Sequence, residues 1–218
     1  SGIIESTGKQ VEDMYPGMRV VVNPDDDAIG NGGSEGGFCD TVLIRNACRG
    51  GNIHLVPDDL SLELAALVEP LSVSLHGVNR AGVKPESKVV VYGAGMIGLG
   101  VLINLRRRGV RDIVVVDRQE FRLDLAGRLG ARATINAARD DLRAELAKLH
   151  GESTKYGFAS VNTDIFIDAA GAGELLQRTI EICAYGARIV IVAVHRKPIP
   201  LDLLPVMAKE IELAGSIA

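Results

Sequence analysis

Residues 88–117 read KVVVYGAGMIGLGVLINLRRRGVRDIVVVD, and this stretch decides the fold. It begins with an apolar run, continues through a turn with three glycines, and ends with a second apolar run and a carboxylate. Uninterrupted apolar runs are typical of parallel strands that are covered on both faces. The order therefore predicts a strand over 89–92, a helix that begins near Met96, and a second strand over 113–116 that ends at Asp117.

The three glycines of the turn have different expected roles. Gly93 begins the turn, Gly95 leaves the backbone open to a pyrophosphate, and Gly98 allows the helix to pack closely on the sheet. The first amides of a helix have no partner within it, so Met96 and the residues after it would present N–H groups to an anion. In this complete strand, turn and helix context, the G-x-G-x-x-G spacing predicts dinucleotide binding and not a merely structural turn.

Asp117 lies 24 residues after Gly93, at the end of the second predicted strand. A carboxylate at this place can accept hydrogen bonds from the hydroxyls of an adenosine ribose, and it would repel a 2′-phosphate. Arg118 has the opposite tendency, because an arginine here can pair with a 2′-phosphate. We expect Asp117 to dominate, so the predicted cofactor is NAD in preference to NADP.

Composition narrows the class of protein. Of the 218 residues, 47% are hydrophobic, only 4% are aromatic and none is Trp, and such an aliphatic core is typical of α/β proteins. Lys and Arg together number 24 and Asp and Glu 28, which gives a formal net charge of -4. This charge argues against a nucleic acid or an anionic membrane as the partner.

The three cysteines, Cys39, Cys48 and Cys183, are widely spaced and form no C-x-x-C pair. This spacing indicates neither a disulfide framework nor a structural zinc knuckle, and it fits a reducing compartment. No apolar run reaches the roughly 18 residues of a membrane span, and the first residues do not look like a secretory signal. We therefore expect a cytoplasmic protein.

From Lys88 onward, predicted strands alternate with predicted helices, which indicates a parallel sheet built from right-handed β-α-β units. Further strands are expected at 133–135, 164–168, 187–194 and 211–217, and helices at 122–129, 140–150, 172–184 and 203–209. Six strands allow the doubly wound order 3-2-1-4-5-6. Ligands bind outside the carboxyl ends of such strands, so residues 169–171 and 192–194, among them Ala170, Val192 and Val194, are expected to line the cofactor cleft.

The first part of the chain differs from the rest and is divided from it near Lys84-Pro85-Glu86. Short strands are predicted at 18–23 and 41–44, with a glycine-rich loop over 24–37 between them. A helix with Ser61 as N-cap is expected over 62–68, an interruption at Glu69-Pro70, and a second helix over 71–81.

Together these segments resemble the medium-chain, zinc-dependent alcohol and polyol dehydrogenases. The resemblance extends over essentially the whole chain and depends on PGMRV at 16–20, GGF at 36–38, VPD at 56–58, LS at 60–61, EPLSV at 69–73 with His76, AGV at 81–83, and the glycine turn with Asp117. It implies part of a GroES-like β-barrel catalytic domain over 1–84 and a Rossmann NAD-binding domain over 85–218. It also implies reversible hydride transfer between an alcohol and the nicotinamide, with a catalytic zinc that polarises the alcohol oxygen.

The resemblance assigns roles to individual residues. Ile97 would contact the cofactor above the pyrophosphate turn, Arg122 would reach the adenosine side, and Val192 and Val194 would pack on the nicotinamide. Glu69, followed by Pro, matches the sorbitol and polyol branch, in which this carboxylate lies at or beside the catalytic zinc. The substrate would then be a polyol, a sugar or a secondary alcohol.

Two departures from the family concern its metals. The first zinc Cys and the Gly-His-Glu segment lie upstream of a pair that looks like Ser1-Gly2, so the chain resembles an internal segment. Glu69 alone cannot hold a tetrahedral zinc, and most of the ligands would lie outside this chain. The loop over 24–37 replaces a segment in which many relatives carry four cysteines, so no structural zinc is expected.

Several alternatives stay open. A zinc-independent reductase similar to quinone oxidoreductases is possible, although Glu69-Pro70 argues against it, and so is a non-catalytic dinucleotide-binding module. His76 is either a core histidine or a further ligand or proton relay, and His195 either contacts substrate or cofactor or is a plain loop residue. Kinship suggests a homodimer or homotetramer through the sixth strand, a sheet edge.

Overall fold

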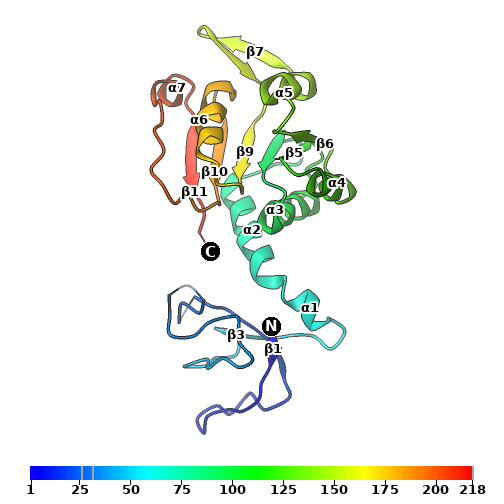
Figure 1. Ribbon diagram of the computed structural model, residues 1–218, viewed down its shortest axis with the longest axis vertical. Coiled ribbons are helices and arrows are strands. Elements are labelled where there is room, and N and C mark those ends of the chain that lie inside the picture. The colour runs from blue at the N-terminus through cyan, green and yellow to red at the C-terminus, as the bar shows by residue number, and fades with distance from the viewer. Residues whose placement is uncertain (26, 31, 218) are drawn as a thin grey trace. The chain divides into compact units, whose positions relative to one another are not determined.

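The computed structural model describes residues 1–25, 27–30 and 32–217 (Figure 1). Contacts between residues divide the chain into two compact units, Ser1–Glu69 and Pro70–Ala218. We call them unit 1 and unit 2 and describe each by itself.

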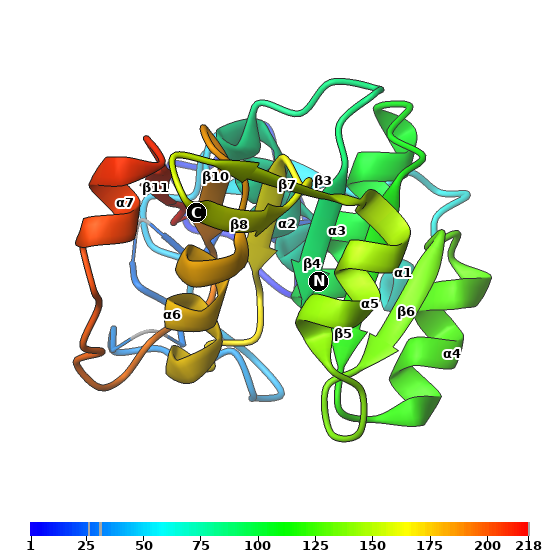
Figure 2. The same ribbon diagram turned by 90° about the horizontal axis from the view of Figure 1, so that it is seen from above.

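Unit 2 is built on a six-stranded parallel sheet (Figures 1 and 2). Its strands are β4 (Val89–Tyr92), β5 (Ile113–Asp117), β6 (Ala133–Asn136), β9 (Ile165–Asp168), β10 (Arg188–Ile191) and β11 (Glu212–Gly215). They lie side by side in the order β11-β10-β9-β4-β5-β6. Numbered along the chain, this is the predicted order 3-2-1-4-5-6, and the Rossmann fold expected from residues 88–117 is confirmed.

Helices cover both faces of this sheet. They are α2 (Val68–Ala81), α3 (Met96–Arg107), α4 (Glu120–Arg128), α5 (Leu142–His150), α6 (Gly173–Ile182) and α7 (Leu204–Ala208). Helices α2, α3 and α4 lie on one face of the sheet and α5 and α6 on the other (Figure 2). Val89 and Val91 pack into a core with α2, α3 and α4, whereas Val90 and Tyr92 pack into a second core with α5 and α6. Successive side chains of a strand point to opposite faces, so a strand that is covered twice must be apolar throughout.

One hairpin of unit 2 was not predicted. Strands β7 (Glu152–Lys155) and β8 (Phe158–Val161) pair antiparallel, with Lys155 opposite Phe158. The two residues between them, Tyr156 and Gly157, both have positive φ angles, of 51° and 82°, as a tight type I′ hairpin turn requires. All residues of β7 are exposed and none of them is apolar, so the strand has no hydrophobic alternation that the sequence could reveal.

Unit 1 contains the short antiparallel strands β1 (Gly2–Ile3), β2 (Arg19–Val22) and β3 (Ile53–Leu55), in the order β1-β2-β3. The predicted strand at 18–23 is confirmed by β2. The predicted strand at 41–44 is wrong, since β2 pairs with β1 and β3 and residues 41–44 adopt no regular structure. β-Branched residues favour a strand only where neighbouring strands can pair and pack with them.

The helices around Glu69 differ from the prediction in one respect. Ser61 caps α1 (Leu62–Ala65) as expected, and its hydroxyl accepts a hydrogen bond of 3.2 Å from the amide of Leu64. The break between helices, however, falls between Ala65 and Val68, and Glu69 and Pro70 lie in the first turn of α2. Proline is tolerated there because amides of the first turn have no partner within the helix.

The three cysteines are all free thiols, as their spacing predicted. Cys183 is buried, and this burial raises the pKa of its thiol to about 11. Among the described residues, no helix has both the length and the apolar character that crossing a bilayer would require. The predicted loop over 24–37 includes Asp26 and Asn31, which lie outside the described residues.

Candidate cofactor site

The glycine turn lies at the carboxyl end of β4, in the middle of the sheet. Gly93 has a φ angle of 90°, and a Cβ atom added to it would lie 3.0 Å from the carbonyl oxygen of Ala169. Both the left-handed backbone and the close approach therefore require glycine at this position. The turn after β9 thus contacts the turn after β4.

Gly98 is tightly packed against the backbone of the turn, whereas Gly95 adjoins open space. A Cβ atom on Gly98 would lie 1.7 Å from the carbonyl oxygen of Gly93, so only glycine allows α3 to begin this close to the turn. This contact accounts for the close packing that the sequence analysis expected of Gly98. A Cβ atom on Gly95 would meet nothing within 4 Å, and the φ angle of Gly95 is −79°. Gly95 is therefore unstrained and adjoins open space, where a bound group could approach the backbone.

The first turn of α3 faces this open space with backbone amides that have no partner within the helix. Gly95 is the N-cap, it provides no side-chain acceptor, and the first turn contains no acidic residue. The amide of Leu99 donates to the carbonyl of Gly95, which makes it the first amide within the helix to have a helical partner. Met96 is exposed and Ile97 partly buried in the turn before it. The arrangement suits an anion, because the partial positive charge of the helix end and its free N–H groups lie together.

Asp117 ends β5 and contacts the glycine turn through its carboxylate. One oxygen, Oδ2, accepts a hydrogen bond of 2.7 Å from the amide of Ala94, and the other, Oδ1, accepts from the amides of Arg118 and Gln119. A guanidinium nitrogen of Arg122 lies 3.9 Å from Oδ2. Each carboxylate oxygen can accept two hydrogen bonds, so Oδ2 keeps capacity for a hydroxyl donor. Asp117 also holds the glycine turn in place, a role that its position in the sequence did not indicate.

Ser74 joins α2 to the beginning of α3. Its hydroxyl lies 3.0 Å from the carbonyl oxygen of Ile97 and 2.7 Å from that of Pro70. A Cβ atom on Gly100 would lie 2.4 Å from the same hydroxyl oxygen, so α2 and α3 approach closely only because Gly100 has no side chain. The helix that contains Glu69 therefore supports the glycine turn that the sequence predicted to bind the cofactor.

Residues 169–171 and 192–194 follow β9 and β10 at the same end of the sheet as the glycine turn. Ala170 is exposed in the first of these segments. Val192 packs at the edge of the core, where one of its methyl groups would lie 2.8 Å from a Cβ atom on Gly77 of α2. Val194 is 80% exposed. The structure thus brings these expected cofactor contacts to one edge, with Val192 partly occupied in packing.

Asp168 is a functional candidate that the sequence analysis treated only as a strand end. It is buried as the last residue of β9, and its Oδ2 lies 2.7 Å from Nε2 of His195. The signal in the sequence was a carboxylate that closes an apolar strand, the same signal that identified Asp117. His195, for which the sequence left two interpretations open, is held by this contact with Asp168, and its role in binding stays a prediction.

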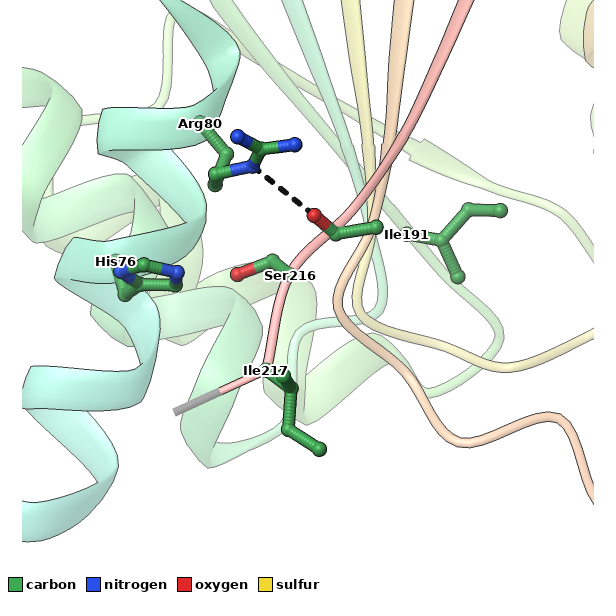
Figure 3. Close-up of a pocket in the computed structure, with 6 residues that line it drawn as sticks. His76, Arg80, Ile191, Ser216 and Ile217 are labelled. Atoms are coloured by element: carbon green, nitrogen blue, oxygen red, sulfur yellow. Dashed lines mark hydrogen bonds between the residues drawn. The ribbon is translucent and has the colours of Figure 1, made fainter.

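A cavity of about 460 Å³ lies beside this edge, between α2 and the ends of β10 and β11 (Figure 3). His76 and Arg80 line it from α2, and Nε of Arg80 donates a hydrogen bond of 3.1 Å to the carbonyl oxygen of Gly215. The hydroxyl of Ser216 is buried there without a partner among the described residues. His76 thus lines a cavity, and it belongs to no group of metal ligands within the described part of the chain.

The described residues do not form a zinc site by themselves. Glu69 lies in the first turn of α2, and no three His, Cys, Asp or Glu side chains of the described residues gather in a way that could hold a metal ion. A catalytic zinc takes three protein ligands in addition to a water. Glu69 is therefore at most one ligand of such a site.

Comparison with known proteins gives consistent results. Residues 97–218, more than half of the chain, match the family described as zinc-binding dehydrogenase. The chain is 30% identical to an L-threonine 3-dehydrogenase of Anaeromyxobacter dehalogenans over 98% of its length and 64% of that protein. It is 28% identical to a (R,R)-butanediol dehydrogenase of Neisseria gonorrhoeae over 100% of its length, again 64% of that protein. The chain thus spans less than two thirds of these relatives.

Solved structures agree with the fold. The crystal structure of 2R,3R-butanediol dehydrogenase from Bacillus subtilis superposes with a TM-score of 0.81 at 28% identity, covering 99% of this chain and 63% of that one. A structure described as a short chain alcohol dehydrogenase from E. coli CFT073, complexed with the cofactor NADH, gives a TM-score of 0.82 at 25% identity, covering 99% of this chain and 65% of that one.

Proposed function

Because this chain belongs to the zinc-binding dehydrogenase family, we propose that it is part of an oxidoreductase that transfers hydride between NAD and a polyol, a sugar or a secondary alcohol. The observation that carries the proposal is the open space at Gly95, bounded by the amino end of α3 and by the carboxylate of Asp117. The butanediol and L-threonine dehydrogenases among the relatives support the class of substrate.

The residues of the turn fit a dinucleotide. The pyrophosphate would lie against Gly95 and accept hydrogen bonds from the first amides of α3, with Met96 and Ile97 next to it. Gly93 and Gly98 keep this space open by allowing the backbone to turn sharply and the helix to begin close by. A pyrophosphate that approaches the backbone at Gly95 would therefore meet no neighbouring atom where a Cβ atom would otherwise lie.

The adenosine ribose would lie at Asp117, where Oδ2 has capacity for a hydroxyl donor. Arg118 and Arg122 are exposed on the same side and would flank the adenosine. The carboxylate favours NAD, because a 2′-phosphate at this place would face a like charge.

The nicotinamide would lie toward the turns after β9 and β10, against Ala170, Val192 and Val194. A dinucleotide crosses the edge of a doubly wound sheet at the point where the strand order reverses, which here is between β4 and β9. When bound, the nicotinamide supplies the C4 position that accepts or gives the hydride. The task of this chain is to orient that ring and to exclude water from it.

The metal part of the proposal concerns the whole protein. We propose Glu69 as one carboxylate at or beside a catalytic zinc, in keeping with the family to which the chain belongs. Other residues of the whole protein would have to provide the remaining ligands, since Glu69 alone cannot hold the ion. Residues 1–84 would then form part of a GroES-like catalytic domain, and no structural zinc is proposed.

We further propose a cytoplasmic homodimer or homotetramer that uses a small molecule as its substrate. Strand β11 is an edge of the sheet and pairs only with β10 among the described strands. Leu213 of β11 and Leu203, Leu204 and Met207 around α7 are exposed apolar side chains near this edge. An unpaired edge with apolar neighbours favours pairing with a second subunit.

Titration with NADH tests the central part of the proposal. The wild-type chain should bind NADH, and should bind it more tightly than NADPH. Gly95→Val should reduce NADH affinity by at least about tenfold, because the new side chain would fill the space proposed for the pyrophosphate. Its stability should fall by no more than about 1 kcal/mol, the usual cost of an apolar residue at an N-cap, since the φ angle of −79° suits any residue and a Cβ atom there meets nothing. Gly127→Val, the same change at an exposed position of α4, is the matched control and should leave NADH binding unaltered.

Unchanged NADH binding by the Gly95→Val chain would contradict the proposed site. For the whole protein, polyol-dependent NADH formation with about one zinc per chain would support the dehydrogenase. Full activity after complete removal of metal would instead support a zinc-independent reductase, and binding without turnover on a broad panel of alcohols would support a non-catalytic module.

A further inference from the structure

Asp168 is a common acceptor for the two turns that follow β9 and β10. Its Oδ1 accepts hydrogen bonds from the amides of Ala170 at 2.9 Å and Gly171 at 3.0 Å, which shape the turn after β9. Its main-chain carbonyl accepts from the amides of Val192 and Ala193, both at 2.9 Å, at the beginning of the segment after β10. One buried residue thus fixes where both segments leave the sheet.

His195 brings the second segment back to the same carboxylate. Its Nε2 lies 2.7 Å from Oδ2 of Asp168, and the two side chains are only 14% and 6% exposed. The other groups that contact this carboxylate are N–H donors, so the carboxylate accepts in each of these hydrogen bonds. An ionised carboxylate has no proton to donate, and Nε2 is therefore the donor in its contact with Oδ2. Hydrogen bonds to a carboxylate are short and strong, so this contact closes residues 192–195 into a loop anchored at Asp168.

The turns after β4, β9 and β10 lie in a row at this edge of unit 2, and each contacts the next. A Cβ atom on Gly171 would lie 3.3 Å from the carbonyl oxygen of Val194 and 3.4 Å from Cβ of Ala193, and one on Gly93 would lie 3.0 Å from the carbonyl oxygen of Ala169. The loop closed by His195 follows β10 and therefore lies at one end of this row of turns. Asp117 of β5 lies at the other end and contacts the opposite side of the glycine turn.

We propose that His195 is a positioning residue for the nicotinamide half of the site. Through its hydrogen bond to Asp168, it fixes the loop over 192–195, and thereby Val194, at the place where the nicotinamide would lie. It has no such effect on the adenosine half, which depends on the glycine turn and on Asp117. The inference rests on the proposed function, because it assumes that a dinucleotide occupies this edge.

Two ligands separate the halves of the site in an experiment. ADP-ribose carries the adenosine, pyrophosphate and second ribose of the cofactor but no nicotinamide, so the ratio of its dissociation constant to that of NADH isolates the nicotinamide half. In His195→Phe, which removes the donor to Asp168, NADH should bind about tenfold more weakly, equivalent to about 1.4 kcal/mol. ADP-ribose should bind as it does to the wild-type chain, which also shows that the variant is folded.

Rescue and control variants sharpen the test. His195→Gln retains an N–H donor that can reach the carboxylate, and should recover most of the NADH affinity. His54→Phe makes the same substitution at an exposed position of β3 in unit 1 and should alter neither ligand. His195→Ala removes the donor without adding bulk, and replaces the Phe variant in the comparison should that variant not fold.

The outcomes separate the two proposals. A wild-type chain that bound neither ADP-ribose nor NADH would overturn the proposed function and this inference with it. Binding of both ligands by the wild-type chain, with equal losses or no loss in His195→Phe and His195→Ala, would overturn the role of His195 alone. A selective loss of NADH affinity that Gln restores would support it.

Discussion

Replacement of Gly98 by alanine should destabilise unit 2, because the new Cβ atom has no room. It would lie 1.7 Å from the carbonyl oxygen and 2.8 Å from the carbonyl carbon of Gly93, both of them backbone atoms that cannot rotate away. Carbon and oxygen atoms approach to about 3.3 Å even in close contacts. The amino end of α3 and the glycine turn would therefore have to separate by roughly 1.6 Å, and the closure of the turn would be lost.

The magnitude follows from two opposing effects. Overpacking of a well-packed region costs about 1–3 kcal/mol, and a clash between two backbone segments belongs at the upper end of that range. Alanine favours the helical conformation over glycine by about 1 kcal/mol, which offsets part of the cost. We expect a net loss of about 2 kcal/mol in the free energy of unfolding.

Urea unfolding followed by far-ultraviolet circular dichroism measures this loss, since the chain contains no Trp. The Gly98→Ala midpoint should fall by roughly 1 M at an unchanged slope. Gly95→Ala is the matched control, because its Cβ atom meets nothing within 4 Å and its stability should fall by no more than about 1 kcal/mol, the usual cost of alanine at an N-cap. If Gly98→Ala were as stable as the wild-type chain, or Gly95→Ala equally destabilised, the packing argument for this turn would be refuted.

Two further predictions concern Asp117 and His150. Asp117→Ser should weaken NADH binding about tenfold, because it removes the proposed acceptor for the ribose hydroxyls. It should also reduce the preference for NADH over NADPH, because it removes the negative charge that would repel a 2′-phosphate. Unchanged relative affinities in parallel titrations would count against this role of Asp117. Burial of His150 lowers its pKa. Below about pH 6.5 the unfolded chain therefore takes up a proton at this histidine that the folded chain excludes. The stability that His150 contributes is complete above this pH and should fall as the pH decreases toward the folded-state pKa. Urea midpoints between about pH 8 and about pH 5 measure the effect, and His150→Leu should show a flatter profile over the same range, whereas identical profiles would contradict it.

The sheet of unit 2 could be predicted because its physical cause is local in the sequence. Residues 89–92 are apolar at every position, since helices cover both faces of β4 and each side chain enters one of two cores. The requirement for Gly98 is equally local, because its contact is with the carbonyl oxygen of Gly93, five residues earlier, whereas Gly93 also approaches Ala169 of a distant turn. Such features appear in the sequence as an unbroken run followed by a fixed glycine spacing.

Features that depend on distant partners could not be predicted in the same way. Residues 41–44 are suitable for a strand but pair with none of the described strands, whereas β3 pairs with β2 without a strong pattern of its own. The cavity beside His76 arises only where α2 packs against the ends of β10 and β11. The pattern of residues within one segment cannot reveal contacts that this segment makes with distant segments.

Asp117 and Asp168 show how much a polar residue at a strand end can indicate. Asp168 lies opposite Tyr92, the last residue of β4, and Asp117 directly follows Val116, which lies opposite Tyr92 on the other side. The two carboxylates therefore close the two strands that flank the glycine turn. Each accepts the amides of the turn beside it, Ala94 in one case and Ala170 in the other. In parallel sheets the free amides of successive turns gather at the carboxyl edge, so an acid that ends an apolar strand is placed to organise them.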